Sequence, residues 1–269
     1  MKRKLLIIFT VITALTSVFA LCACNSKTST DKLLRINWSS GGFSETFVYE
    51  ASGKIGDEAV TGTLTITVSP ETDGFSITRT QIMSNGDKID GKVYFTNNGN
   101  FAPTESICTF SADGVVQTQK IVYDGKKVRF YSSDGDSVPA DATPVEYDIA
   151  SPYYDNMQFY TIIRGATFDK NYNLSFKTFV PNEGRVVTLT TALGATENVP
   201  YSIGENDFSV DCQRVYLSLN QSNSGGKTIS VYYATTELTL SNRYKVKQVP
   251  IKISESKFTY TLTDLSASK

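Results

Sequence analysis

Alternation of apolar and polar residues most constrains what this chain can fold into. From Phe43 to the C-terminus the dominant period is two, most clearly over residues 63–68, 229–233 and 258–262. Such a period places the apolar side chains on one face of a β-strand and the polar side chains on the other. The apolar residues are mostly Val, Ile, Leu, Tyr and Phe, and of these the β-branched and aromatic types favour strands. The chain is therefore predicted to form half-buried antiparallel strands.

Turn residues separate these strands at short intervals. Asn-Gly stands at 85–86, and Asp-Gly stands at 113–114, 124–125 and 134–135. Glycine supplies the positive φ that tight hairpins require. We expect a mainly β fold, an antiparallel meander curled into a barrel, a half-barrel or a sandwich.

One segment departs from this pattern. Ser151 offers an N-cap and Pro152 suits the first position of a helix. Apolar residues then follow at helical spacing: Tyr153, Met157, Tyr160 and Ile163. These signals predict a helix over residues 152–164, packed on the sheet.

Two later strands change phase. Cys212 and Val215 fall on opposite phases, which predicts a β-bulge near Gln213 and Arg214. The segment 243–253 changes phase near Gln248 and contains Pro250. Because proline cannot donate to a β-ladder, this strand is predicted to lie at a sheet edge there.

The N-terminus has the features of an export signal. Basic residues 2–4 precede an apolar run over 5–21, and Leu21-Cys22-Ala23-Cys24 follows it, which resembles a bacterial lipobox. The resemblance implies cleavage after Ala23 and a diacylglyceryl group on Cys24. Modification of Cys22 and retention of the run as a membrane-spanning helix are the alternatives. We expect a lipid anchor that holds the protein on a bacterial membrane, facing outside the cytoplasm.

The domain organisation follows from this processing. Residues 1–23 are predicted to be the signal peptide, 24–33 the lipidated cysteine and a polar tether, and 34–269 the β domain. The composition changes over 137–143, so an arrangement of two lobes with a boundary there is the alternative to one continuous domain.

The composition excludes several kinds of catalytic site, metal site and binding partner. The chain has no histidine, which excludes Ser/His/Asp triads and His-bearing zinc sites, and no cofactor or metal is expected. Its 26 basic residues nearly balance 27 acidic ones, which argues against a nucleic-acid partner. An enzyme is not expected. A glycan-active enzyme that uses paired carboxylates is the less favoured alternative.

The remaining candidate residues are cysteines and tyrosines. Cys108 and Cys212 are the cysteines left after lipidation, and they form either a disulfide or two separate buried thiols. The tyrosines suit either a barrel core or an apolar groove with phenolic hydroxyls. In the second interpretation the ligand-binding candidates are Tyr153, Tyr160, Tyr216, Tyr232 and Tyr233.

Several short segments resemble one family in their order along the chain. They are residues 47–51, 160–164, 184–187, 230–233 and 249–253. From the helix onward the chain resembles the exported bacterial family catalogued as domain of unknown function 3108. The resemblance implies an exported, mostly antiparallel β domain and supplies no catalytic residues.

We therefore expect a binding or structural module at the cell envelope that holds an apolar or amphipathic ligand. Its partners would be the membrane, through Cys24, and a lipid, a glycan or an envelope protein. A scaffold that pairs the edge near residues 243–250 with another protein's strand is the alternative.

Overall fold

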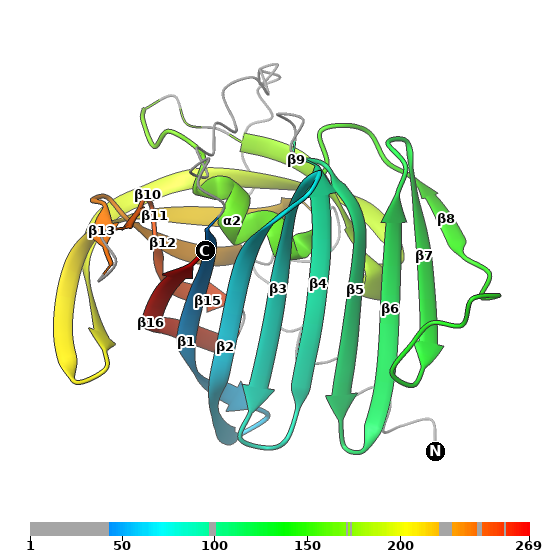
Figure 1. Ribbon diagram of the computed structural model, residues 1–269, viewed down its shortest axis with the longest axis horizontal. Helices are drawn as coiled ribbons and strands as arrows, with labels where there is room; N and C mark the ends of the chain where they lie inside the picture. The colour runs from blue at the N-terminus through cyan, green and yellow to red at the C-terminus, as the bar shows by residue number, and fades with distance from the viewer. Residues whose placement is uncertain are drawn as a thin grey trace.

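The fold is built almost entirely from antiparallel strands (Figure 1). The computed structural model describes residues 43–96, 101–170, 172, 174–220, 228–240, 244–255 and 257–269. The first half contributes β1 (Ser44–Ile55), β2 (Glu58–Glu71), β3 (Gly74–Met83), β4 (Lys88–Thr96), β5 (Pro103–Ala112), β6 (Val115–Tyr123), β7 (Lys127–Asp134) and β8 (Val145–Asp148). The second half contributes β9 (Leu174–Val180), β10 (Arg185–Ile203), β11 (Asn206–Asn220), β12 (Thr228–Ala234), β13 (Leu238–Thr239), β14 (Lys245–Val246), β15 (Pro250–Glu255) and β16 (Phe258–Ser268).

Fourteen of these strands form one sheet in the order β8-β7-β6-β5-β4-β3-β2-β1-β16-β15-β12-β11-β10-β9. The last strand, β16, pairs with β1 and so joins the two halves of the chain. Residues 137–143 connect β7 to β8, and these two strands pair with each other within the same sheet. Strands β13 and β14 form a separate hairpin.

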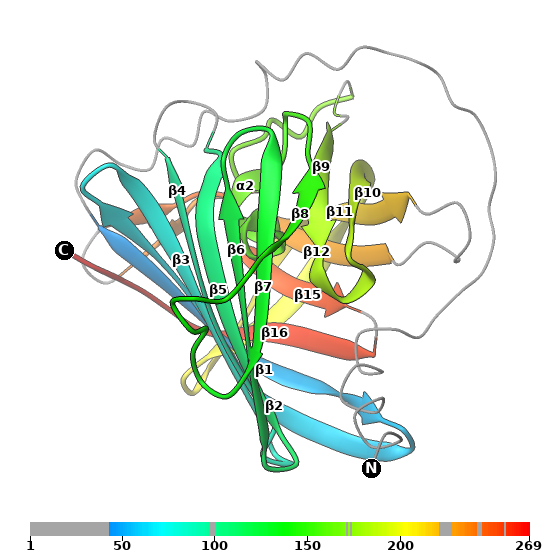
Figure 2. The same ribbon diagram turned by 90° about the vertical axis from the view of Figure 1, so that its right-hand side faces the viewer.

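The sheet curls so that its two edge strands, β8 and β9, come close together. Figure 2 shows the curvature from the side. Phe179 of β9 lies 4.7 Å from Tyr147 of β8 and 5.4 Å from Phe130 of β7, measured between ring centroids. We call this apolar contact between the edges the seam. The predicted mainly β, curled antiparallel fold is confirmed, in the form of a half-barrel that side chains rather than hydrogen bonds hold together at the seam.

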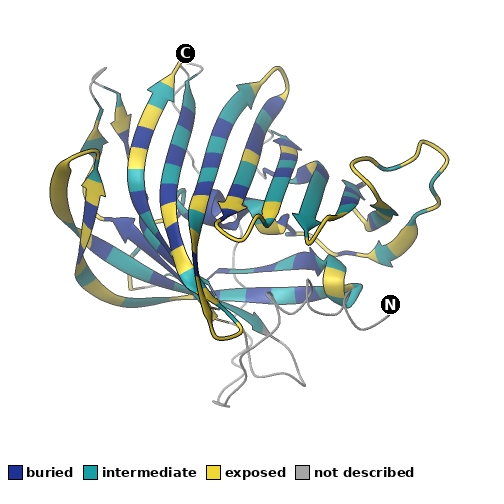
Figure 3. Cartoon of the chain, turned by 90° about the horizontal axis from the view of Figure 1, so that it is seen from below, coloured by how far each residue is buried: buried dark blue, intermediate teal, exposed yellow. Residues whose placement is uncertain are grey.

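The alternating sequence produces the core directly. In Figure 3 buried and less buried positions alternate along the strands. In β2, for example, Leu64, Ile66 and Val68 are buried, whereas the threonines between them are not. Glycines of the Asp-Gly turns at 114, 125 and 135 have the predicted positive φ. The hairpin signals in the sequence were therefore correct.

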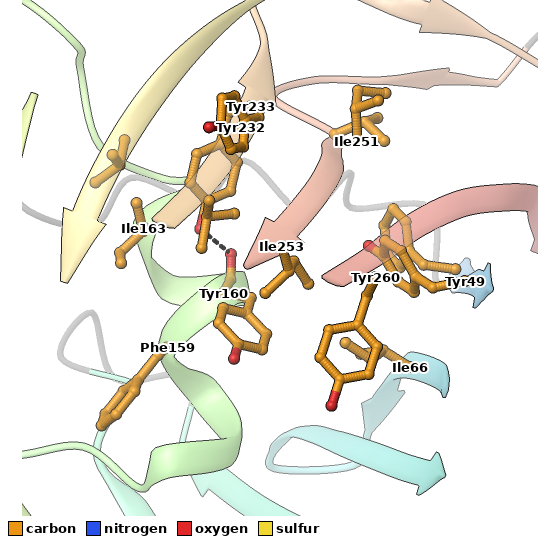
Figure 4. Close-up of a cluster of buried hydrophobic side chains, with 14 of the residues drawn as sticks. Tyr49, Ile66, Phe159, Tyr160, Ile163, Tyr232, Tyr233, Ile251, Ile253 and Tyr260 are labelled. Carbon is orange, nitrogen blue, oxygen red and sulfur yellow. Dashed lines mark hydrogen bonds between the residues drawn. The ribbon is translucent and has the colours of Figure 1, made fainter. Parts of the chain in front are cut away.

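The largest buried side chains gather inside the curled sheet. Figure 4 shows part of this cluster, including Tyr49, Tyr233 and Tyr260. The hydroxyl of Tyr49 donates to the carbonyl of Pro250, and that of Tyr233 donates to the carbonyl of Tyr160. These two tyrosines thus satisfy their hydroxyl groups while filling the core.

The helical segment is shorter than predicted. A 3-10 turn, η3 (Asn156–Gln158), leads into α2 (Phe159–Ile163), and the N-cap is Asp155 rather than Ser151. The residues before Asp155 pair with β9 instead: Tyr154 N donates to Lys177 O, and Lys177 N donates to Pro152 O. Because this backbone is extended, the predicted helix start at Pro152 is wrong.

The phase change in β11 coincides with a register shift in its pairing with β10. The register shifts between Leu193 and Thr196 of β10, so that residues 194 and 195 lie opposite Arg214. The bulge lies at the predicted level, but its extra residue belongs to β10 rather than β11.

Pro250 is the first residue of β15, a strand that pairs with both β12 and β16. At Pro250 itself β15 pairs with Tyr233 of β12 alone, because pairing with β16 begins at Lys252. The strand as a whole lies inside the sheet, so the predicted edge is limited to its first residues, where a proline disrupts little of the ladder.

Candidate ligand-binding cavity

The inside of the curled sheet contains a cavity of about 220 Å³, which we call the interior cavity. Strands β3 to β6 line one side, and β15 and β16 line another. The segments around η3 and η4 (Pro181–Glu183) complete the lining. Its described lining residues are Arg79, Gln81, Ile89, Ser106, Cys108, Phe110, Gln119, Ile121, Asn156, Met157, Val180, Pro181, Asn182, Glu255, Phe258 and Tyr260.

A row of residues in register explains where space is available. Arg79, Gly91, Cys108 and Gln119 pair in succession across β3, β4, β5 and β6. A side chain on Gly91 would begin 2.5 Å from the sulfur of Met157, so glycine leaves room for that thioether. Met157 thus fills the space over Gly91, whereas the small side chain of Cys108 borders the cavity directly.

Polar side chains meet at one end of the cavity lining. Arg79 Nη2 lies 3.2 Å from Gln81 Oε1 and 3.5 Å from Glu255 Oε2. The hydroxyl of Tyr160 donates to Glu255 at 3.0 Å, and that of Tyr260 lies 3.4 Å from Gln81 Oε1. Figure 4 shows both hydroxyls pointing to the same side. We call these five residues the Arg79 cluster.

The charges of this cluster follow from its surroundings. Burial opposes the positive charge of Arg79, but the Glu255 carboxylate raises the pKa of Arg79 above its ordinary value. Burial, and then the same carboxylate, raise the pKa of Tyr160 and of Tyr260. The arginine is therefore charged and both phenols are neutral hydrogen-bond donors at physiological pH.

One donor of the cluster lacks an acceptor. Arg79 Nε is buried and forms no hydrogen bond with any described residue. Most buried polar groups in folded proteins are hydrogen-bonded, so such an atom beside a cavity marks a place for an acceptor oxygen.

Asp155 holds the η3 side of the cavity in place. Its carboxylate accepts hydrogen bonds from Ser106 Oγ at 2.6 Å, from the Tyr123 hydroxyl at 2.8 Å and from Met157 N at 2.9 Å. The side chain of Gln158 accepts from Asp155 N, which completes a capping box. Burial raises the pKa of Asp155, and these hydrogen bonds partly oppose the shift.

The five tyrosines predicted as ligand-binding residues do not form one site. Tyr160 belongs to the Arg79 cluster, and the hydroxyl of Tyr233 donates to the backbone carbonyl of Tyr160. The guanidinium carbon of Arg214 lies 4.6 Å from the ring centroid of Tyr216 and 5.2 Å from that of Tyr232. Tyr153 stacks on Tyr123 next to the seam.

Sequence reasoning missed Arg79, Gln81, Glu255 and Tyr260 as candidates. A signal for the first two was present, because they continue the inward phase of Ile77 in β3. Polar residues at positions where alternation predicts apolar ones can mark a polar site within a core.

The cysteines are separate. Cys108 in β5 and Cys212 in β11 are both free thiols. Seven strands, β4 to β12 in sheet order, lie between β5 and β11. The disulfide alternative is therefore wrong for this structure, and that of two separate thiols holds.

A second cavity, of about 410 Å³, lies where the end of the β10–β11 hairpin approaches β1 and β16. Its lining includes Tyr201, Phe208 and Thr261. Thr261 alternates with the buried Tyr260 and Leu262, so this cavity lies on the opposite face of the sheet from the core. Because Phe208 remains 46% exposed there, we consider the interior cavity the better candidate site.

The predicted signal peptide, Cys24 and the tether lie outside the described residues. Among the described residues, no helix has the length and apolar character needed to cross a membrane. Nor do three metal-binding side chains gather anywhere in that part of the chain.

The fold and its cavity define a β-barrel-like protein. A solved structure supports this class: the crystal structure of a β-barrel-like protein of domain of unknown function DUF1849 from Brucella abortus is similar, with a TM-score of 0.53. The two proteins share 9% sequence identity over 84% of this chain and 98% of the other, which shows a likeness of fold alone.

The chain belongs to the family described as "Protein of unknown function (DUF3108)", whose sequence model matches residues 48–263. The match extends the resemblance, seen in the sequence from the helix onward, to most of the first half. No curated protein sequence matches the chain.

Proposed function

We propose that this protein is a ligand-binding module of the bacterial cell envelope, lipid-anchored through Cys24, and that its interior cavity holds a small amphipathic molecule. The observation that carries the proposal is a largely apolar cavity with one charged, incompletely hydrogen-bonded arginine at its edge. Pockets that bind small molecules combine apolar walls with a few placed polar groups. The lipobox-like sequence before Cys24 supports the location.

A glycosidase activity has less support than ligand binding. A glycosidase needs two carboxyl groups flanking the scissile bond, whereas Glu255 is the single acidic residue among the described residues that line the cavity.

Docking through a sheet edge is also disfavoured. The backbone of residues 152–154 bonds to Lys177 in the middle of the free edge of β9, and β8 is a strand of four residues whose Glu146 pairs with Lys127 and Arg129.

The test is native mass spectrometry of residues 25–269, which contain every strand described above, purified without detergent from the native host. We expect a small amphipathic molecule bound at one per chain. Cys108→Leu fills the cavity and should abolish its retention. Thr78→Leu adds similar volume on the exposed face of β3 and is the matched control. A ligand-free mass for wild type and both variants would contradict the proposal.

The location is tested separately. Labelling with a radioactive fatty acid should mark the wild-type chain and not a Cys24→Ala variant. Label that persists in the variant would overturn the assignment of Cys24 as the anchor.

A further inference from the structure

The Arg79 cluster carries balanced charges, which bears on the kind of ligand the cavity selects. Resting on the proposed binding function, we propose that the interior cavity binds an amphipathic ligand whose polar end is uncharged, such as an alcohol, an ester or an amide.

The charge balance is the first argument. Arg79 and Glu255 are the charged residues among the described lining, and they pair at 3.5 Å. Burial keeps the Cys108 thiol neutral by raising its pKa to about 12. A ligand carboxylate would compete with Glu255 for Arg79 and would leave two negative groups close together. A ligand ammonium would compete with Arg79 for Glu255 and would leave two positive groups close together.

The unused hydrogen-bonding positions are the second argument. Arg79 Nε is a buried donor that has no acceptor within the described part of the chain. The described contacts of Glu255 with Arg79 and Tyr160 are all made through Oε2, which leaves Oε1 as an acceptor for a ligand. A hydroxyl can accept from the first group and donate to the second. An ester or amide carbonyl can accept from Arg79.

The size of the cavity is the third argument. At roughly 30 Å³ for each water-sized heavy atom, a cavity of 220 Å³ holds about seven such atoms. Phe110, Ile121, Met157 and Phe258 provide apolar contacts for the rest of such a molecule. The part of the ligand that enters the cavity is therefore a short chain of about six carbons together with its polar end.

The experiment compares three probes with the same chain: hexan-1-ol, hexanoate and hexylammonium. Dissociation constants are measured by NMR titration of residues 25–269 at pH 7. We expect the wild-type protein to bind hexan-1-ol at least about tenfold more tightly than either ion.

Two variants then change the charge of the cluster. Glu255→Gln leaves Arg79 unopposed and should shift the preference to hexanoate. Arg79→Gln should shift it to hexylammonium, and the double variant should restore the preference for the alcohol. Thermal unfolding of each variant establishes that it is folded, and if a variant does not fold, the wild-type series decides alone.

The outcomes separate the two proposals. Tighter binding of hexanoate or hexylammonium to the wild-type protein would overturn the inference about the polar end and leave the binding function standing. Failure of all three probes to bind, together with a ligand-free mass from the native host, would overturn the binding function itself.

Discussion

At the scale of single residues, the environment of each polar group decides whether it serves structure or binding. Glu45 of β1 and Arg164, which follows α2, pair at 2.7 Å with 9% of each side chain exposed. The hydroxyl of Tyr244 donates to the same carboxylate at 3.2 Å. This pair ties the end of the helix to the middle of the sheet, and it lies among packed side chains rather than beside the interior cavity.

Glu45→Gln should therefore lower the free energy of unfolding by about 2–4 kcal/mol, because it removes the carboxylate that pairs with a buried arginine at 2.7 Å. The matched control is Asp90→Asn, which removes the pair of Lys88 and Asp90, two side chains that are 46% and 43% exposed. That change should cost less than about 1 kcal/mol. Equal losses in urea unfolding of the two variants would contradict this account.

The thiols provide a second prediction at this scale. Burial raises the pKa of Cys108 and of Cys212 to about 12. An ordinary cysteine of pKa about 8.5 is about a quarter ionised at pH 8, whereas these thiols remain protonated. Iodoacetamide should alkylate both cysteines at least about 100-fold more slowly in the native protein than in denaturant, since the thiolate is the reactive form. Mass spectrometry over time measures this, and rapid native labelling of Cys108 would disprove it.

At the scale of elements, alternation in the sequence predicted most strands correctly because each has one buried face. Residues 63–68 and 258–262 are examples. The helix was misplaced because Ser151 and Pro152 are local signals, whereas the backbone of residues 152–154 is determined by pairing with Lys177 of a later strand. The cavity could not be predicted, since Arg79 and Glu255 are 176 residues apart and meet only in the folded sheet.

Asp155 is the group on which the short helical segment depends. Asp155→Ala removes the cap and leaves the hydroxyls of Ser106 and Tyr123 without their acceptor, so it should lower the free energy of unfolding by about 2–4 kcal/mol.

Because burial raises the pKa of Asp155, the native state binds a proton at this group more readily than the unfolded state. The stability that this group contributes is therefore greatest below its unfolded pKa of about 3.9 and falls as the pH rises through the raised native pKa.

Urea unfolding of the wild-type and Asp155→Ala proteins between pH 4 and pH 7 measures this dependence. The difference in the free energy of unfolding between the two proteins should grow as the pH is lowered. A difference that shrinks toward acidic pH would show that the carboxylate is stabilised in its charged form instead.

At the scale of the whole molecule, the curled sheet depends on the seam to keep its two edges together. Phe179→Ala removes the ring that contacts both Tyr147 and Phe130, and it should cost about 3–5 kcal/mol. Amide hydrogen exchange should increase in β7, β8 and β9 more than in β1 and β2.

The control is Phe208→Ala, because Phe208 stacks on Tyr201 but remains 46% exposed. It should cost less than about 1.5 kcal/mol. If amide exchange in Phe179→Ala increased equally in all strands, the seam would not open independently of the rest of the sheet, and this account would be contradicted.

The central claim is that the interior cavity binds an amphipathic ligand, and a crystal structure of residues 25–269 soaked with 5-bromopentan-1-ol tests it most directly. The account predicts an anomalous bromine signal inside the cavity, among Phe110, Ile121 and Phe258, with the hydroxyl beside Arg79 and Glu255. No bromine signal within the cavity at saturating ligand, or a signal confined to the outer face near Phe208, would contradict it.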